Sequence, residues 1–175
     1  MQLLFIRHGQ AAPYCADDAG RALTDFGQKQ AKQTADYVLA NFAPDLIISS
    51  PYIRAKQTAE ILQRNLTTQH HNTKLTFLDS ITPDDDPKAT VLDIANLIER
   101  EFGQIFDHEN LPERCIVIVC HMPIIAKLVG ILTELHPENF ELAECQVLKT
   151  SVFTNGLATK ITGFIPVQPW GHYFQ

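Results

Sequence analysis

An uninterrupted apolar run near the middle of the chain constrains its fold more than any other feature. Residues 115–120 read Cys-Ile-Val-Ile-Val-Cys, with no polar residue at alternate positions. A strand with one face in water alternates apolar and polar side chains, whereas a parallel strand covered on both faces is apolar throughout. The run therefore predicts a strand of a parallel sheet that lies between two layers of helices.

The rest of the chain alternates short apolar runs with helical patterns. We expect strands at 2–6, 45–49, 74–78 and 115–120, and helices after Thr24, Pro51, Asp84–Asp86 and Pro123. Two further strands, 147–153 and 157–165, are expected to form a hairpin, because Asn155-Gly156 between them is a strong turn signal. The pattern predicts an α/β fold: a three-layer α/β/α sandwich with a mostly parallel sheet and a C-terminal β-hairpin.

Composition excludes several classes of protein. With 175 residues the chain is expected to form one domain, 1–175. A net charge of −6 argues against nucleic-acid binding, which relies on clustered Lys and Arg. No apolar run approaches the ~18 residues of a membrane span. The apolar run at residues 3–6 is too short for a secretory signal, so a cytoplasmic location is expected. The four cysteines form no C-x-x-C pair, and no metal or cofactor is expected.

Three of the expected strands end in residues suited to phosphate chemistry. The first ends in Arg7-His8-Gly9, the second is followed by Arg54 about one helical turn into the next helix, and the central strand ends at His121. Ligands of open parallel sheets bind beyond the carboxyl ends of the strands. Guanidinium groups match phosphoryl oxygens, and a neutral imidazole can act as a nucleophile. These residues are therefore expected to converge on a phosphoryl group.

Four segments resemble the histidine phosphatase (phosphoglycerate mutase-like) superfamily. Arg7-His8-Gly9 is similar to its RHG signature, and Leu23-Thr24-x-x-Gly27 to its L-T-x-x-G element. The stretch from Ser49 to Ala59, SSPYIRAKQTA, is similar to its S-S-P-x-x-R-A-x-Q-T-A segment, and Val119 to Pro123 to its second-histidine segment. The chain resembles the short SixA-type phosphohistidine phosphatases in particular. The similarity lies in the short interval between Arg54 and His121 and in the segment Leu78-x-x-Ile81-Thr82-Pro83.

The resemblance implies a role for each matched residue. It implies that His8 is the nucleophile, that Arg7, Arg54 and His121 form the phosphate pocket, and that Arg21 is a further phosphate or substrate contact. Gln10 is either a phosphoryl contact or part of a turn. Phosphatases of this superfamily usually have a carboxylic acid that protonates the leaving oxygen. The candidates here are Asp79, Asp84 and Asp85, although Asp84–Asp86 also fit helix capping.

Three functions are compatible with these residues. The first is a metal-independent phosphatase that acts on phosphohistidine of a signalling protein, such as a histidine phosphotransfer domain, through a covalent intermediate on His8. The second is a small-molecule phosphomonoesterase, which needs a working acid because an alkoxide is a poor leaving group. The third is a non-catalytic module that binds phosphoproteins. The expected ligands are phosphate or other oxyanions, with no nucleic acid and no membrane.

Overall fold

The computed structural model describes residues 1–68, 73–103 and 113–169. Its centre is a six-stranded sheet in the order β3-β2-β4-β1-β5-β6. The first four strands in that order are parallel to one another. Strand β5 pairs antiparallel with β1, and β6 pairs antiparallel with β5. The strands are β1 (Gln2–Arg7), β2 (Leu46–Ser49), β3 (Lys74–Phe77), β4 (Cys115–Cys120), β5 (Cys145–Lys149) and β6 (Thr159–Phe164).

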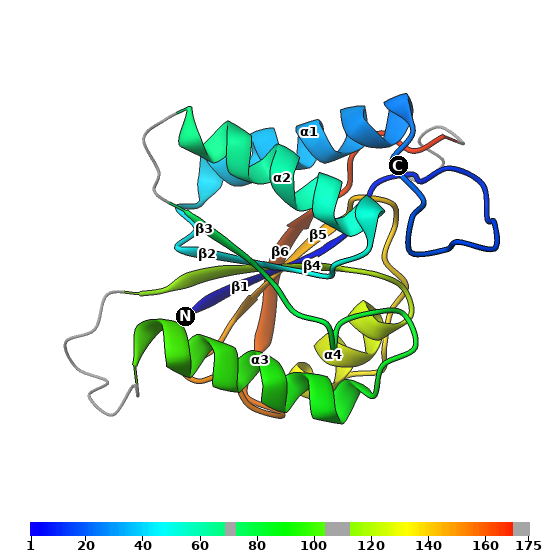
Figure 1. Cartoon of the computed structure of the whole chain (residues 1–175). Coiled ribbons are helices and arrows are strands. Elements are labelled where there is room, and N and C mark those ends of the chain that lie inside the picture. Colours follow the sequence, from blue (N-terminus) through cyan, green and yellow to red (C-terminus); the bar gives the residue numbers. More distant parts are fainter. Residues whose placement is uncertain (69–72, 104–112, 170–175) are drawn as a thin grey trace.

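Helices cover both faces of the sheet (Figure 1). Helices α1 (Asp25–Asn41) and α2 (Ile53–Thr67) lie on one face, and α3 (Pro87–Phe102) and α4 (Ile124–Thr133) lie on the other. The predicted three-layer α/β/α sandwich with a mostly parallel sheet is confirmed.

The alternation of side chains along the strands divides the core into two clusters. In β1, Leu3 and Phe5 pack with the α3 and α4 side, whereas Leu4 and Ile6 pack with the α1 and α2 side. All six residues of β4 are buried, which confirms that this strand is covered on both faces. Burying these side chains contributes roughly 1.5–3 kcal/mol for each large aliphatic or aromatic residue.

Side-chain caps begin two of the helices, as the sequence predicts. The Thr24 hydroxyl accepts a hydrogen bond from the Gly27 amide at the start of α1. The Asp86 carboxylate accepts hydrogen bonds from the amides of Lys88 and Ala89 at the start of α3. Such caps satisfy amides that have no partner within the helix.

The C-terminal hairpin differs from the prediction in its connection. Strand β5 ends at Lys149 rather than at 153, and β6 begins at Thr159, so 150–158 is a loop instead of the three-residue turn at 154–156. The amides of Gly156 and Ala158 donate to the carbonyl oxygens of Ile131 and Leu132 in α4. These contacts hold the loop on α4 and satisfy backbone groups that a longer strand ladder would otherwise have paired.

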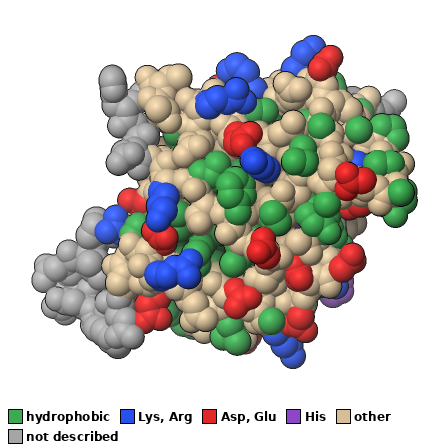
Figure 2. All heavy atoms as spheres, in the orientation of Figure 1, with side chains coloured by type: hydrophobic (Ala, Val, Ile, Leu, Met, Phe, Trp, Pro, Cys, Tyr) green, Lys and Arg blue, Asp and Glu red, His purple; other side chains and the backbone are tan. Residues whose placement is uncertain are grey.

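The surface carries charges of both signs. On the face drawn in Figure 2, acidic and basic side chains are interspersed. In the three described segments, no helix has both the length and the apolar character needed to cross a bilayer. All four cysteines, at positions 15, 115, 120 and 145, are free thiols, and the last three are buried.

Candidate active site

Parallel pairing brings the ends of β1, β2 and β4 together at one edge of the sheet. The amide of His8 donates to the carbonyl oxygen of Cys120 at 3.1 Å, and the amide of Ser50 donates to that of Val119 at 3.0 Å. The residue after each strand is therefore held beside its neighbours. The side chains of His8, Arg54 and His121 are all buried here, at 8%, 2% and 1% exposure.

The hydrogen bonds of His8 define which of its ring nitrogens carries the proton and which carries the lone pair. Its Nδ1 lies 2.7 Å from the carbonyl oxygen of Gly9, which only accepts, so Nδ1 carries the proton. Its Nε2 then holds the lone pair and accepts a hydrogen bond from Nε of Arg54 at 3.2 Å. The backbone of Gly9 thus orients His8 with Nε2 as the potential nucleophile.

The His121 ring lies beside His8 and offers a hydrogen-bond donor, whereas His8 offers a lone pair. The two ring centroids are 5.1 Å apart. Nε2 of His121 is 2.8 Å from the hydroxyl of Ser50. With the Ser50 hydroxyl, which itself accepts from the Tyr52 amide, as the donor to Nε2, Nδ1 of His121 carries the proton. Nδ1 is buried and has no partner among the described residues, which leaves a donor for an oxyanion.

Burial and nearby cations keep both imidazoles neutral. Burial is the main cause that lowers the pKa of His8 from 6.5 to about 3. The hydrogen bond to Gly9 raises this pKa, whereas the charges of Arg54, Arg7 and Arg21 lower it further. Burial also lowers the pKa of His121 to about 2, together with the proximity of His8 and the arginines. A neutral His8 has a lone pair available for nucleophilic attack.

Arg7 is anchored at one end of its guanidinium and free at another. Its NH1 donates to the carbonyl oxygen of Phe140 at 2.6 Å, whereas its buried Nε has no partner among the described residues. Burial lowers the pKa of Arg7, and the negative charges of Glu141 and Glu144 oppose that shift. Arg7 remains a cation at any ordinary pH.

A loop after β1 covers Arg54 through the carboxylate of Asp18. NH2 of Arg54 donates to Oδ2 of Asp18 at 2.9 Å, and NH1 donates to the Asp18 carbonyl oxygen at 2.6 Å. Oδ1 of Asp18 accepts from Nε of Arg21 at 2.7 Å, and NH1 of Arg21 donates to the Ala12 carbonyl oxygen at 2.9 Å. Arg21, expected to contact phosphate, is thus largely bound within this loop.

Two glycines allow the loop and helix α1 to approach the site. A Cβ on Gly9 would overlap the carbonyl oxygen of Gly27, and one on Gly27 would overlap that of Gln10. The Gly9 amide donates to the hydroxyl of Thr58 at 3.2 Å. Oε1 of Gln10 accepts from the hydroxyl of Thr24 at 2.7 Å, so its side chain braces the start of α1.

The candidate acids lie apart from these contacts. The Asp85 carboxylate accepts hydrogen bonds from the amide and hydroxyl of Thr82, Asp84 is exposed, and Asp79 lines a surface pocket with Phe77 and Arg100. In the described contacts, none of the three bonds to Arg7, His8, Arg54 or His121. Within residues 1–68, 73–103 and 113–169, no cluster of His, Cys, Asp or Glu could hold a metal ion.

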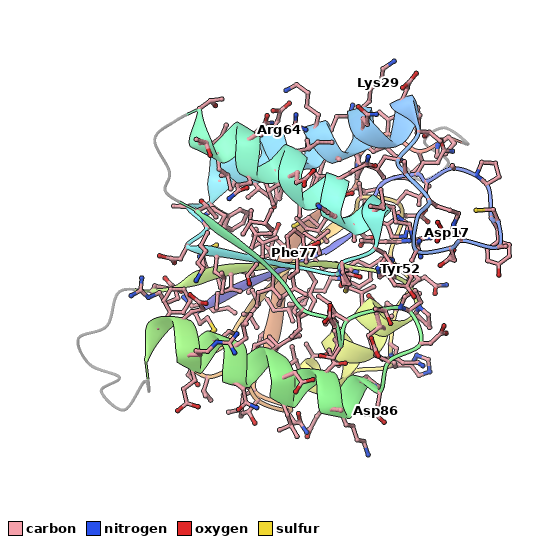
Figure 3. The ribbon with its side chains drawn as sticks, viewed as in Figure 1. Asp17, Lys29, Tyr52, Arg64, Phe77 and Asp86 are labelled. Carbon is pink, nitrogen blue, oxygen red and sulfur yellow. The ribbon has the colours of Figure 1, made fainter. Side chains whose placement is uncertain are left out.

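Sequence reasoning missed two residues that touch the site. Asp18 belongs to none of the matched motifs, although its spacing from Arg21 suits an ion pair. The Tyr52 ring centroid lies 5.2 Å from the His121 ring centroid and 5.1 Å from the guanidinium carbon of Arg54. Tyr52 is at the same end of the molecule as Asp17 of the loop (Figure 3), and no sequence signal indicates its place.

Comparisons with known proteins agree with this geometry. The model of the histidine phosphatase superfamily (branch 1) matches residues 3–76, which include Arg7, His8 and Arg54. A phosphohistidine phosphatase SixA homolog from Haemophilus influenzae is 26% identical over 137 residues, covering 74% of this chain and 76% of the relative. Residues 3–76 therefore carry the sequence pattern of the histidine phosphatase superfamily, and most of the chain is similar to a SixA homolog.

Solved structures of other phosphatases share the whole fold. The protein histidine phosphatase SixA complexed with tungstate superposes with a TM-score of 0.76 and 22% identity, covering 95% of this chain and 97% of that one. A mycobacterial glucosyl-3-phosphoglycerate phosphatase superposes with a TM-score of 0.69 and 20% identity, covering 91% and 96%. At these identities the structural likeness describes the fold, and the substrate has to be argued from the site.

Proposed function

We propose that this chain is a metal-independent phosphohistidine phosphatase of the histidine phosphatase superfamily, which acts on a signalling protein such as a histidine phosphotransfer domain. Nε2 of His8 attacks the phosphorus while the P–N bond to the substrate imidazole breaks. The other ring nitrogen of that imidazole takes a proton from solvent, so the imidazole leaves as a neutral group. Water then attacks the phosphorus on His8, orthophosphate leaves, and the proton from that water remains in solution. The roles of Arg7, Arg54 and His121 are to hold the phosphoryl oxygens.

The neutral, oriented imidazole of His8 is the observation that carries this proposal. Its Nδ1–H is held by the Gly9 carbonyl oxygen, and its Nε2 faces Arg54. Two buried nitrogens, Nε of Arg7 and Nδ1 of His121, have no partner among the described residues. Unpartnered buried donors are costly unless a ligand satisfies them, and phosphoryl oxygens suit both.

The substrate class is supported by the acid chemistry near the site. Among the described residues, only Asp18 brings a carboxylate into contact with Arg54, and it is ionised by two arginines. A phosphohistidine has a better leaving group than an alkyl ester and depends less on an acid. The name of the Haemophilus influenzae relative, phosphohistidine phosphatase SixA homolog, points the same way.

Transfer of labelled phosphate tests the proposal directly. A histidine phosphotransfer domain labelled on its phosphohistidine is mixed with the native chain, with His8→Ala, and with His136→Ala as a surface control. We expect transient, base-stable and acid-labile label together with phosphate release for the native chain and the control, and neither for His8→Ala. Phosphate release without any label on the native chain would refute the covalent intermediate. Neither label nor release would refute the phosphohistidine assignment.

A further inference from the structure

We propose that Asp18 is a positioning residue of the phosphoryl pocket, which fixes Arg54 against His8 and limits how tightly the pocket holds an oxyanion. The inference rests on the proposed function only in that the pocket receives phosphoryl oxygens. It concerns a residue of the loop after β1 that lies outside the motif residues Arg7, His8, Arg54 and His121.

Asp18 holds one edge of the Arg54 guanidinium by two acceptors. Its carbonyl oxygen accepts from NH1 at 2.6 Å, and its Oδ2 accepts from NH2 at 2.9 Å. Because the guanidinium is planar and rigid, fixing this edge also fixes the direction of Nε–H on the other side. That Nε–H points at Nε2 of His8, 3.2 Å away. Asp18 therefore sets the geometry of a bond in which it takes no part.

The bond between Arg54 and His8 has to change when a substrate arrives. Nε2 of His8 uses its lone pair to accept from Arg54 and cannot attack phosphorus until it is released. A phosphoryl oxygen is a stronger acceptor for a guanidinium than a neutral imidazole is. The Nε–H can therefore pass from His8 to the oxygen while NH1 and NH2 stay on Asp18. The guanidinium then remains beside the reacting atoms instead of following the phosphate outward.

The charge of Asp18 has a separate effect on the ligand. Although its partial burial acts to raise the pKa, hydrogen bonds from Arg21 and Arg54 lower the pKa of Asp18, so its carboxylate is ionised. The charge partly neutralises the two cations that would otherwise face the oxyanion together with Arg7. A phosphatase has to release orthophosphate at each turnover, and a pocket with uncompensated arginines would retain it.

Helix α2 and the loop are joined firmly enough for this role. The Ile53 amide at the start of α2 donates to the carbonyl oxygen of Ala19 at 3.0 Å, directly after Asp18. The Arg21 guanidinium braces the other oxygen of the carboxylate, with NH2 at 2.6 Å from Oδ1. The Asp18 carboxylate is thus fixed from both sides.

Replacement of Asp18 by Asn tests both effects, because it keeps the shape and removes the charge. We expect orthophosphate, measured by titration calorimetry, to bind about tenfold more tightly. We expect kcat to fall about tenfold to a hundredfold, because a neutral amide and the backbone carbonyl oxygen of residue 18 hold the Arg54 edge less firmly than the carboxylate does. Asp17→Asn is the matched control, since Asp17 lies in the same loop, is exposed and caps only the Gly20 amide. Unchanged phosphate affinity and kcat in Asp18→Asn, or equal changes in both variants, would overturn the inference.

A measurement that needs no turnover completes the test. In imidazole nitrogen NMR of the folded chain without phosphate, we expect the Nε2 resonance of His8 to shift in Asp18→Asn toward that of an unbonded ring nitrogen, and to stay in place in Asp17→Asn. An unchanged resonance in Asp18→Asn would refute the positioning role. A native chain that binds orthophosphate without acting on phosphohistidine would refute the proposed function alone, whereas a chain that binds no oxyanion would refute both.

Discussion

The two buried imidazoles make the stability of this fold sensitive to acid. In the folded chain the pKa of His8 is about 3 and that of His121 about 2, compared with 6.5 for a solvated imidazole. As pH falls below 6.5, these two side chains take up protons in the unfolded chain but not in the folded one. Unfolding then binds protons, so the free energy of unfolding falls until pH reaches the folded-state values.

The size of the effect follows from the unfolded chain. At pH 5, protonation of an imidazole with a pKa of 6.5 stabilises the unfolded state by about 2 kcal/mol, whereas at pH 8 the term is negligible. The folded-state term is negligible at both values because both folded pKa values lie well below 5. His8 and His121 together therefore remove about 4 kcal/mol between pH 8 and pH 5, and His8→Asn should lose about 2 kcal/mol less over that range.

Urea unfolding followed by circular dichroism at pH 8, 7, 6 and 5 measures this difference. His136→Asn is the control: the His136 side chain is exposed, so unfolding changes its surroundings little, and the variant should follow the native chain. Contributions from all other residues cancel in the comparison. If His8→Asn and the native chain lost the same stability between pH 8 and pH 5, His8 would not be held neutral in the fold and the nucleophile argument would fail.

Three further changes have defined outcomes. Gly27→Ala should lower the free energy of unfolding by about 1–3 kcal/mol in urea, because its Cβ would overlap the carbonyl oxygen of Gln10; unchanged stability would contradict that packing. Arg54→Lys should lower kcat/KM about a hundredfold or more, since an ammonium lacks the planar fork that contacts His8 through Nε and Asp18 through NH2. Near-native kinetics would contradict the requirement for both contacts. A chelator should leave the rate of phosphohistidine hydrolysis unchanged, and a large loss would disprove metal independence.

The elements predicted correctly are those with a local physical cause. The run at 115–120 is apolar because β4 is covered on both faces, and Thr24 and Asp86 sit where amides need caps. The extent of the hairpin strands was predicted wrongly because its cause is distant. Residues 156 and 158 bond to α4 rather than to a strand, and no pattern around Asn155-Gly156 reveals that contact.

The same distinction applies to the site. Arg7, His8, Arg54 and His121 lie at or next to the ends of elements whose position the sequence indicates, so their convergence could be expected. The groups that orient the two arginines could not, because they come from far along the chain. The Phe140 carbonyl that binds Arg7 is 133 residues away, and Asp18 is 36 residues from Arg54. Such pairings depend on how the loops are laid across the sheet edge.

The absence of an available acid in the described site predicts a steep dependence of rate on the leaving group. Asp18 is held ionised by Arg21 and Arg54 and cannot donate a proton, and Asp79 and Asp84 make no described contact with the site. Without an acid, an ester is cleaved only as fast as its alkoxide or phenoxide can leave.

We therefore expect p-nitrophenyl phosphate to be cleaved about a hundredfold or more faster, in kcat/KM, than glycerol phosphate, since general acid catalysis typically contributes about 10²–10⁴-fold. Equal rates would mean that an acid operates. The acid would then be identified by comparing Asp79→Asn, Asp84→Asn and Asp85→Asn. The variant that lacks the acid would cleave glycerol phosphate more slowly and p-nitrophenyl phosphate at the native rate. A steep dependence unchanged in all three variants would leave phosphohistidine, whose imidazole departs without strong acid help, as the substrate that this site is best suited to cleave.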